Sequence, residues 1–354
     1  MAMLIRSIVG EEVCLDAGGM VRVLCMFSCN SISICDEELV NIGVGIYPTL
    51  SLINHSCVPN TALIFSGSTA TLRSIREIRP GEEICQSYTE VADPESVRRR
   101  GLREAYFFEC CCEGCVGEGV KTADPRTSYI CPLPRCPGVL FPISQPHNDH
   151  SIRPDSDDDI ESEDPTTYHC TTHGPLLAPH LSTFLTNLTH ARKQFYTPGS
   201  DLPASAPRPP IPHLESSLKL WSTLAPPTHH LRIALHRALQ AAHLSTGNLR
   251  AALVHAEMLA GAYAEIYNPR GGTYHPAVSV QRYLAFTLRF TIAVEEDGRG
   301  NGLNEDEEGL RGLARDGREV VRLLGVSHGE ASALWREARG RGEEVEVRLR
   351  GRGF

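Results

Sequence analysis

Three cysteines in the segment "FFECCCEGC" have the spacing of a metal-binding site. Cys110, Cys112 and Cys115 form a C-x-C-x2-C pattern, and three thiolates this close along the chain can share one tetrahedral Zn²⁺ with a fourth ligand from elsewhere. Cys57, in the earlier motif "NHSC", is the candidate for that fourth ligand. The alternative is a group of buried thiols, although three cysteines within six residues rarely pack as hydrophobic side chains. Cys111 is out of register with the pattern, so we do not expect it to be a ligand.

A second set of candidate metal ligands follows along the chain. The segments "YICPLPRCPG" and "YHCTTHGP" contain a C-x4-C pair and a C-x2-H pair, which together look like a zinc ribbon with a long insertion. An aromatic residue precedes each pair and a glycine follows it, which favours this interpretation. His169 is an alternative ligand, and a site without metal is the other alternative. The expected ligands of this second zinc ion are Cys131, Cys136, Cys170 and His173.

The composition limits the class of protein. The formal charge of −9 argues against a general nucleic-acid binder. No stretch approaches the ~20 apolar residues that a membrane-spanning helix needs, and the N-terminus becomes acidic too early for a secretory signal. We therefore expect an intracellular, soluble protein of the cytoplasm and/or nucleus, with no membrane partner and no sequence-specific binding of nucleic acid.

The cysteines and one basic run also bear on location. All thirteen cysteines lie between Cys14 and Cys170, and an odd number in a reducing compartment argues against a disulfide framework. The run "RRR" at Arg98 to Arg100 is expected to lie on a solvated helix face rather than to act as a nuclear signal.

Composition also divides the chain into regions. Residues 1 to about 105 contain short strand-like runs such as "ATLRSIREI" and "GEEICQSY", separated by Gly and Pro. An acidic run over 146–166 has almost nothing to bury and is predicted to be a disordered loop. The segment "YTPGSDLPASAPRPPIP" is typical of an extended linker. From about residue 213 apolar residues recur at helical spacing, which is compatible with stacked helix pairs or with an ordinary helical bundle.

Four motifs together resemble a known family. "CNSISIC", "GVGIYPTLSLINHSCVPN", "REIRPGEEICQSY" and "YFFECCCEGC" occur in the order and spacing of SET-domain lysine methyltransferases, and they most resemble the SET and MYND-finger (SMYD) group. The resemblance covers about residues 28–115. It implies an α+β fold, with a SET-type β-fold, a zinc-bound post-SET segment and an all-α, tetratricopeptide-like C-terminal domain.

The resemblance and the composition together give a domain plan. The expected parts are the C-terminal part of a SET domain (1–105), a post-SET zinc segment (106–120), a zinc ribbon around the acidic loop (121–180), a partly helical segment with a Pro-rich linker (181–212) and a helical tetratricopeptide-like domain (213–354).

The resemblance also implies a function and a set of site residues. The function is S-adenosylmethionine-dependent protein-lysine N-methylation of a histone or another protein. Tyr88 is the expected catalytic tyrosine, which orients the amine and the methyl group, and Tyr106 is expected to line the lysine channel. The expected cofactor-binding residues are Asn30, Ser51, Asn54, His55, Tyr88 and Phe108. The structural alternatives are a helix cap for Asn54, a core histidine for His55 and strand-capping tyrosines.

The chain also departs from the family pattern. Relatives begin with a strand that carries a Gly-x-Gly cofactor loop and then a MYND zinc finger, and neither precedes residue 28 here. We expect either a truncated isoform or gene model of a methyltransferase, or a non-catalytic zinc-containing interaction protein. In the first case the acidic helices would help to hold a basic substrate or a chaperone or peptide partner.

Overall fold

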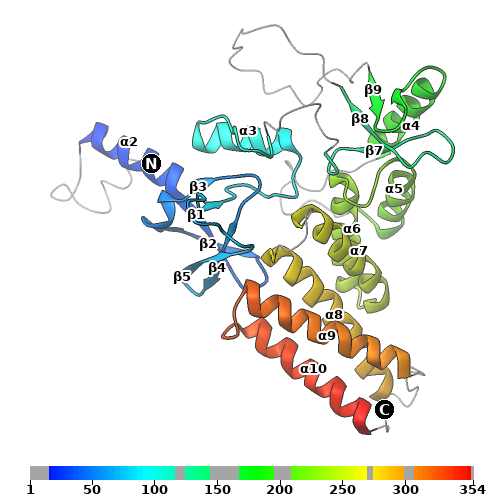
Figure 1. Cartoon of the computed structure of the whole chain (residues 1–354). Helices are drawn as coiled ribbons and strands as arrows, with labels where there is room; N and C mark the ends of the chain where they lie inside the picture. Colours follow the sequence, from blue (N-terminus) through cyan, green and yellow to red (C-terminus); the bar gives the residue numbers. More distant parts are fainter. Residues whose placement is uncertain are drawn as a thin grey trace. The chain divides into compact units, whose positions relative to one another are not determined.

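The computed structural model describes residues 16–115, 124–143, 167–194, 209–268, 274–298 and 307–351. The chain divides into two compact units, and their helices and strands are labelled in Figure 1. One unit combines Met1–Gly117 with Arg270–Phe354, and the other is Glu118–Pro269. No helix in the described ranges is both long enough and apolar enough to cross a membrane.

Two antiparallel strand pairs lie in the first unit. β1 (Ser31–Cys35) pairs with β2 (Asn41–Ile46), and β4 (Thr61–Ser66) pairs with β5 (Thr69–Ser74). Asp36 forms the first turn, because its side chain accepts the backbone N–H groups of Glu38 and Val40 at 3.0 and 2.9 Å. Gly67 forms the second with a φ of 58°, a conformation that glycine adopts at little cost.

A short parallel pair joins two of the sequence motifs. β3 (Asn54–His55) lies beside β6 (Cys85–Gln86), with Asn54 opposite Cys85. Buried Asn60 holds the pair together: its side-chain oxygen accepts the N–H of Cys85 at 2.9 Å, and its NH2 group donates to the Glu83 carbonyl at 2.8 Å. The "NHSC" and "GEEICQSY" motifs are thereby brought side by side.

Two helices flank these strands. α2 (Ala17–Asn30) departs from the prediction of strands and turns for this region. Its start is stabilised by Asp16, whose side chain accepts the N–H of Gly19 at 2.7 Å. The apolar residues that follow do not alternate as in a half-buried strand, so their pattern is compatible with a helix. α3 (Glu95–Tyr106) ends at Phe107, which has a left-handed φ of 58°.

The prediction that the three arginines Arg98 to Arg100 lie on a solvated face of α3 is wrong for one of them. Arg99 and Arg100 are partly or largely exposed and pair with acidic side chains. Arg98 is buried, with 1% of its surface exposed. The reason is the helical period of 3.6 residues, which turns consecutive residues to different sides of the helix.

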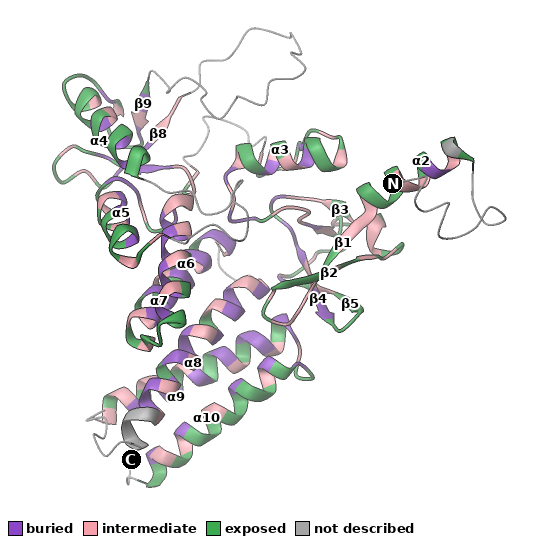
Figure 2. Cartoon of the chain, turned by 180° about the vertical axis from the view of Figure 1, so that it is seen from behind, coloured by how far each residue is buried: buried purple, intermediate pink, exposed green. Residues whose placement is uncertain are grey.

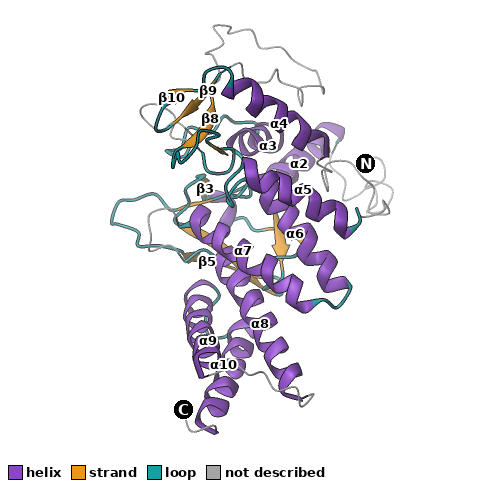
Figure 3. Ribbon diagram, turned by 90° about the vertical axis from the view of Figure 1, so that its right-hand side faces the viewer, coloured by secondary structure: helices purple, strands orange, loops and turns teal. Residues whose placement is uncertain are grey.

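The remaining helices of the first unit are α8 (Pro276–Gly298), α9 (Glu307–Ser327) and α10 (Ala333–Gly351), which lie side by side (Figure 3). Gly317 on α9 allows a close approach, because a Cβ there would lie 3.1 Å from the ring of Phe286 on α8. Buried apolar side chains of all three helices form one core.

Specific hydrogen bonds tie these helices to the strands of the same unit. Arg73 of β5 donates from Nε to the Val326 carbonyl at 3.0 Å, and the N–H of Tyr274 donates to the Ile75 carbonyl at 2.7 Å. The Glu37 carboxylate, in the turn after β1, accepts the N–H of Leu334 in the first turn of α10 at 2.9 Å. This carboxylate caps a helix that lies almost 300 residues away along the chain.

The second unit combines a small sheet with helices. β7 (Tyr129–Ile130), β8 (Val139–Pro142), β9 (Tyr168–Cys170) and β10 (Gly174–Pro175) form an antiparallel sheet in the order β10-β9-β8-β7. The helices are α4 (His180–Gln194), α5 (Ile211–Leu224), α6 (His230–Ser245) and α7 (Leu249–Tyr267). Tyr129 and Tyr168 of the sheet pack edge-on against Phe184 of α4, with ring centroids 5.4 and 5.0 Å apart. Sheet and helices therefore share one core.

The α+β class and the largely helical C-terminal region are confirmed. The helices from 213 onward do not form one compact unit, because α5–α7 belong to the second unit and α8–α10 to the first. The tetratricopeptide likeness stays a prediction. The predicted disordered loop over 146–166 lies outside the described residues, as does most of the predicted Pro-rich linker.

The cap of α10 by Glu37 is open to a direct test. We expect Glu37→Ala to lower the free energy of unfolding by about 1 kcal/mol, because a backbone N–H at the helix start loses its acceptor and the helix dipole loses a favourable charge. Glu37→Gln, which keeps an acceptor oxygen, should lose less. Chemical denaturation measures both, with the exposed neighbour Glu38→Ala as control. Equal stability of Glu37→Ala and Glu38→Ala would contradict the role of this cap.

Candidate functional site

The structure brings the first set of predicted metal ligands together. The ligand atoms of Cys57, Cys110, Cys112 and Cys115 all lie within 4.8 Å of one another. Cys57 comes from the loop after β3, and the other three follow the end of α3. Cys111 is exposed and its thiol points to the Glu109 carbonyl, 3.6 Å away, as its position out of register indicates.

The geometry of this cluster fits a tetrahedral metal ion. The sulfurs of Cys57 and Cys115 are 3.6 Å apart. A disulfide would need about 2.05 Å, whereas the edge of a tetrahedron with Zn–S bonds of about 2.3 Å is ~3.8 Å. The N–H of Cys57 donates to the sulfur of Cys112 at 3.4 Å. The hydrogen bond from the Cys57 side chain, together with backbone N–H groups, lowers the pKa of the Cys112 thiol. The pKa of Cys57 itself is raised, first by that same hydrogen bond and then by burial. A thiolate, the form that binds metal, is therefore favoured at Cys112 in this arrangement.

The second predicted set also converges. The ligand atoms of Cys131, Cys136, Cys170 and His173 lie within 4.8 Å of one another, and the sulfurs of Cys136 and Cys170 are 3.6 Å apart. His169, the alternative ligand, is not in this group, and its ring lies 6.4 Å from that of Phe141. Because β9 alternates its side chains between two faces, His169 cannot point the same way as Cys170.

Backbone N–H groups and a glycine shape this second cluster. The N–H of Gly138 donates to the sulfur of Cys136 at 3.3 Å, and the N–H of Thr172 donates to that of Cys170 at 3.4 Å. A Cβ at Gly138 would lie 2.6 Å from the Cys170 sulfur and 2.5 Å from the Thr172 hydroxyl. The glycine that follows the C-x4-C pair is therefore required, because the ligands pack too closely for a side chain at this position.

An aromatic group lies beside the first cluster. The rings of Tyr88 and Tyr106 are 4.8 Å apart, and the ring of His55 lies 5.3 Å from Tyr88 and 6.0 Å from Phe108. The Tyr88 hydroxyl donates to the Ile53 carbonyl at 2.6 Å. Four residues predicted for catalysis or cofactor binding thus form one half-buried group.

His55 connects this aromatic group to the metal cluster. Its Nδ1 accepts the backbone N–H of Tyr88 at 3.0 Å, so a neutral ring carries its proton on Nε2. That Nε2 lies 3.3 Å from the sulfur of Cys57 and donates to it. Burial lowers the pKa of His55, which favours the neutral ring. Both ring nitrogens of His55 therefore have partners within the protein, and the residue links the aromatic group to the four-cysteine cluster.

Burial also sets the protonation state of the tyrosines. It raises the pKa of Tyr88, and the neighbouring Tyr106 raises it further. Burial likewise raises the pKa of Tyr106, with a smaller contribution from Cys29 of α2. Both phenols therefore stay protonated at neutral pH. They can donate and accept hydrogen bonds but cannot act as general bases there.

The other predicted cofactor residues have local partners. Asn54, on β3, donates from its exposed side chain to the Glu83 carboxylate at 2.7 Å. Ser51 donates to the Tyr47 carbonyl at 3.1 Å, and Asn30 at the end of α2 donates to the Met26 carbonyl at 2.8 Å. These bonds fix the three side chains near their own elements and do not by themselves test a role in binding.

Two residues of the site were not found from the sequence. Asn60 braces the β3–β6 pair, and buried Arg98 donates from Nε to the sulfur of Cys57 at 3.4 Å. Asn60 follows the "NHSC" motif closely enough to have been suspected of a polar role. Nothing in the run "RRR" distinguishes Arg98 from its neighbours, because their difference arises only from packing.

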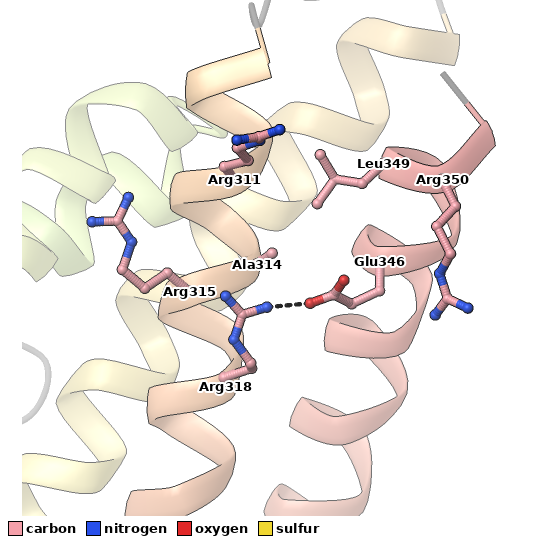
Figure 4. Close-up of a pocket in the computed structure, with 7 residues that line it drawn as sticks. All are labelled: Arg311, Ala314, Arg315, Arg318, Glu346, Leu349 and Arg350. Atoms are coloured by element: carbon pink, nitrogen blue, oxygen red, sulfur yellow. Dashed lines mark hydrogen bonds and ion pairs between the residues drawn. The ribbon is translucent and has the colours of Figure 1, made fainter. Parts of the chain in front are cut away.

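A pocket between α9 and α10 has a different character (Figure 4). Its lining holds none of the predicted site residues and consists of Arg311, Ala314, Arg315, Arg318, Glu346, Leu349 and Arg350. An ion pair between Arg318 and Glu346 crosses it. It offers no nucleophile, thiol or aromatic ring for group-transfer chemistry.

Comparisons with known proteins show what the N-terminal part of the chain is similar to. Residues 11–89 match the SET domain family. "Histone-lysine N-methyltransferase SMYD3" of Mus musculus is 46% identical over 99 residues, which are 28% of this chain and 23% of that protein. "N-lysine methyltransferase SMYD2" of Homo sapiens is 40% identical over 124 residues, 35% of this chain and 29% of that protein.

A third relative extends the comparison to plants. "Histone-lysine N-methyltransferase ASHR1" of Arabidopsis thaliana is 39% identical over 119 residues, 32% of this chain and 25% of that protein. The chain carries a SMYD-like SET region. It spans between 23% and 29% of the length of these curated relatives. The SET match contains Tyr88, His55 and Cys57, whereas Tyr106, the other three cysteines of the first cluster and the whole second cluster lie C-terminal to it.

The close contact at Gly138 yields a test of the second cluster. We expect Gly138→Ala to lower the zinc content of the purified protein by about one ion per chain, because the new methyl group would displace the Cys170 sulfur. Metal analysis by mass spectrometry measures this. Gly261→Ala, in α7 with open space around its Cβ, is the matched control. An unchanged zinc content in Gly138→Ala would show that these residues do not hold the ion.

Proposed function

We propose that this protein is an S-adenosylmethionine-dependent protein-lysine N-methyltransferase with two structural zinc ions. The observation that carries the proposal is the position of His55. Its ring accepts the N–H of Tyr88 and donates to the metal-ligand sulfur of Cys57. The zinc cluster thereby orients the segment that presents the catalytic tyrosine, beside a second tyrosine 4.8 Å away.

The chemistry of the surrounding groups fits the cofactor. Phe108 and His55 offer half-buried ring faces on which a nucleobase can stack. Asn54 offers an exposed amide for the polar part of the molecule. Asn30 and Ser51 are proposed as further contacts. When bound, S-adenosylmethionine supplies a methyl group on an electrophilic sulfonium.

Tyr88 and Tyr106 act on the lysine rather than as bases. A lysine amine has a reference pKa near 10.4, so it must lose a proton and its water shell before it can attack. The Tyr88 hydroxyl donates its proton to the Ile53 carbonyl, so its oxygen would act toward the lysine as an acceptor for an amine N–H. The two rings form an apolar wall that excludes water. Catalysis would then come chiefly from alignment in a narrow channel.

The two zinc ions have structural roles in this proposal. Each cluster supplies four protein ligands and leaves no open coordination position, as is usual for structural zinc. The four-cysteine ion would join the loop after β3 to the segment after α3, both of which contribute to the aromatic group. The Cys3His ion would join two hairpins of the β7–β10 sheet and stabilise the core of the second unit.

The substrate is proposed to be a protein lysine, on a histone or on another protein. The names of the relatives include both histone-lysine and general N-lysine methyltransferases, which supports the class but selects neither. A chaperone or peptide partner for the helices, and a location in cytoplasm and/or nucleus, are further parts of the proposal.

A non-catalytic interaction protein is the second candidate, and one observation favours it. β2 presents Ile42, Val44 and Ile46 to solvent, with 62%, 65% and 41% of their surfaces exposed (Figure 2). An apolar strand face of this kind is typical of a surface that binds another polypeptide. Calorimetric titration of the zinc-loaded protein with S-adenosylmethionine separates the candidates, since no measurable binding would favour this second one.

Separate roles for Tyr88 and Asn54 give the kinetic test. We expect Tyr88→Phe to lower turnover on a lysine peptide by about a hundredfold with little change in cofactor affinity, because only the aligning oxygen is lost. Asn54→Ala should instead weaken cofactor binding about three- to tenfold, because its hydrogen bonds are made before the reaction. Turnover on peptide arrays and calorimetry measure the two effects.

Tyr47→Phe is the matched control for the tyrosine variant. It removes a hydroxyl that donates to the Ser68 carbonyl at 2.7 Å, away from the aromatic group, and should leave turnover unchanged. Wild-type turnover by Tyr88→Phe would overturn the assignment of the catalytic tyrosine. A protein that binds zinc but stays inactive on broad arrays would overturn the proposed activity.

A further inference from the structure

Arg98 is buried in a way that its neighbours on the same helix are not. Only 1% of its surface is exposed. Arg99 pairs with Glu95 and Glu109, and Arg100 lies 4.0 Å from Glu104 with 57% of its side chain exposed. Burying a guanidinium is costly unless nearby groups compensate its charge and satisfy its N–H donors.

The contacts of Arg98 lead to the four-cysteine cluster. Its Nε donates to the sulfur of Cys57 at 3.4 Å. One terminal nitrogen donates to the carbonyl of Asp93, in the turn before α3. The planar guanidinium is thus held at two points, and its orientation toward the sulfur is fixed by the backbone.

The charge of the metal-loaded cluster gives these contacts a purpose. Four thiolates around one divalent zinc leave two net negative charges. Two of the four ligands are almost fully buried, since only 4% of the surface of Cys57 and 2% of that of Cys110 are exposed. One guanidinium in contact with Cys57 reduces the net charge of the buried group to a single negative charge. The Cys3His cluster of the second unit reaches that same charge through its ligands alone.

We propose that Arg98 is the charge-balancing residue of the four-cysteine zinc site, where its buried guanidinium offsets one negative charge of the metal-loaded cluster and so slows the loss of the metal. The inference rests on the proposed zinc ion at that cluster. Arg98 is a positioning residue in this scheme. The Cys57 sulfur receives N–H groups from both Arg98 and His55, so Arg98 acts on Tyr88 only through the cluster and His55.

The test is the rate of zinc release from the full chain to a chromogenic chelator, pyridylazoresorcinol. We expect Arg98→Met to release one of its two zinc ions about 10- to 100-fold faster than the unchanged protein, because loss of an outer-shell partner typically lowers metal affinity by about that factor and a loss of affinity is expressed mainly in the release rate. The ion of the Cys3His cluster serves as an internal reference and should be released at the unchanged rate. Arg100→Met, an exposed arginine of the same helix, is the matched control and should behave as wild type.

Two further measurements separate charge from mere packing. Arg98→Lys keeps the positive charge, so its release rate should lie between those of Arg98→Met and wild type. If Arg98→Met does not fold, the neutral Arg98→Gln takes its place, and wild-type release by that variant would overturn the proposal. With Co²⁺ in place of zinc, loss of the N–H donor to Cys57 in Arg98→Met should shift the sulfur-to-cobalt charge-transfer band to lower energy.

The outcomes distinguish this inference from the proposed function. Equal release rates and an unshifted cobalt band in Arg98→Met would overturn the role of Arg98 while the two zinc sites stand. Equal release from Arg98→Met and Arg98→Lys, both faster than wild type, would also overturn it, because charge would then be irrelevant. An unchanged protein without zinc at the four-cysteine cluster would overturn the metal site itself and this inference with it.

Discussion

The sulfur of Cys57 is the point at which the parts of the SET region meet. It lies 3.6 Å from the sulfur of Cys115 and receives N–H groups from His55 and Arg98. These groups come from β3, from α3 and from the segment after α3, three pieces of chain that would otherwise share little core. Because a small sheet of two-residue strands buries little apolar surface, a metal–thiolate cluster is an efficient way to hold such pieces together.

The second unit also combines a cysteine cluster with a small sheet. Cys131 and Cys170 belong to the core that also contains Tyr168, Phe184 and Trp221. The strands of the β7–β10 sheet have only two to four residues each, so the cysteine cluster and the aromatic packing both contribute to holding it in place. Each unit therefore combines a cysteine cluster with helices, although the helices differ: α4–α7 in one unit and α8–α10 in the other.

The aromatic group shows how structural and chemical roles are divided. Burial keeps the phenols of Tyr88 and Tyr106 protonated, which leaves orientation as their contribution to the proposed methyl transfer. Orientation demands rigidity, and rigidity comes from His55, whose two ring nitrogens are both engaged. A site that works by alignment thus depends on groups that never touch a substrate.

The sequence by itself determined the two cysteine clusters, the α+β class and the membership of the tyrosines and His55 in one motif set. The C-x-C-x2-C and C-x4-C spacings restrict the metal ligands locally, whatever surrounds them, whereas the α+β class and the motif set came from the resemblance of four motifs to the SMYD group. Only the tertiary structure decided that Arg98 is buried while Arg99 and Arg100 are not, that Asn60 braces β3 against β6, and that the helices after residue 213 are divided between two units. These outcomes depend on which face of a helix or loop is covered by distant chain, and neighbouring residues of one type carry no local signal that distinguishes them.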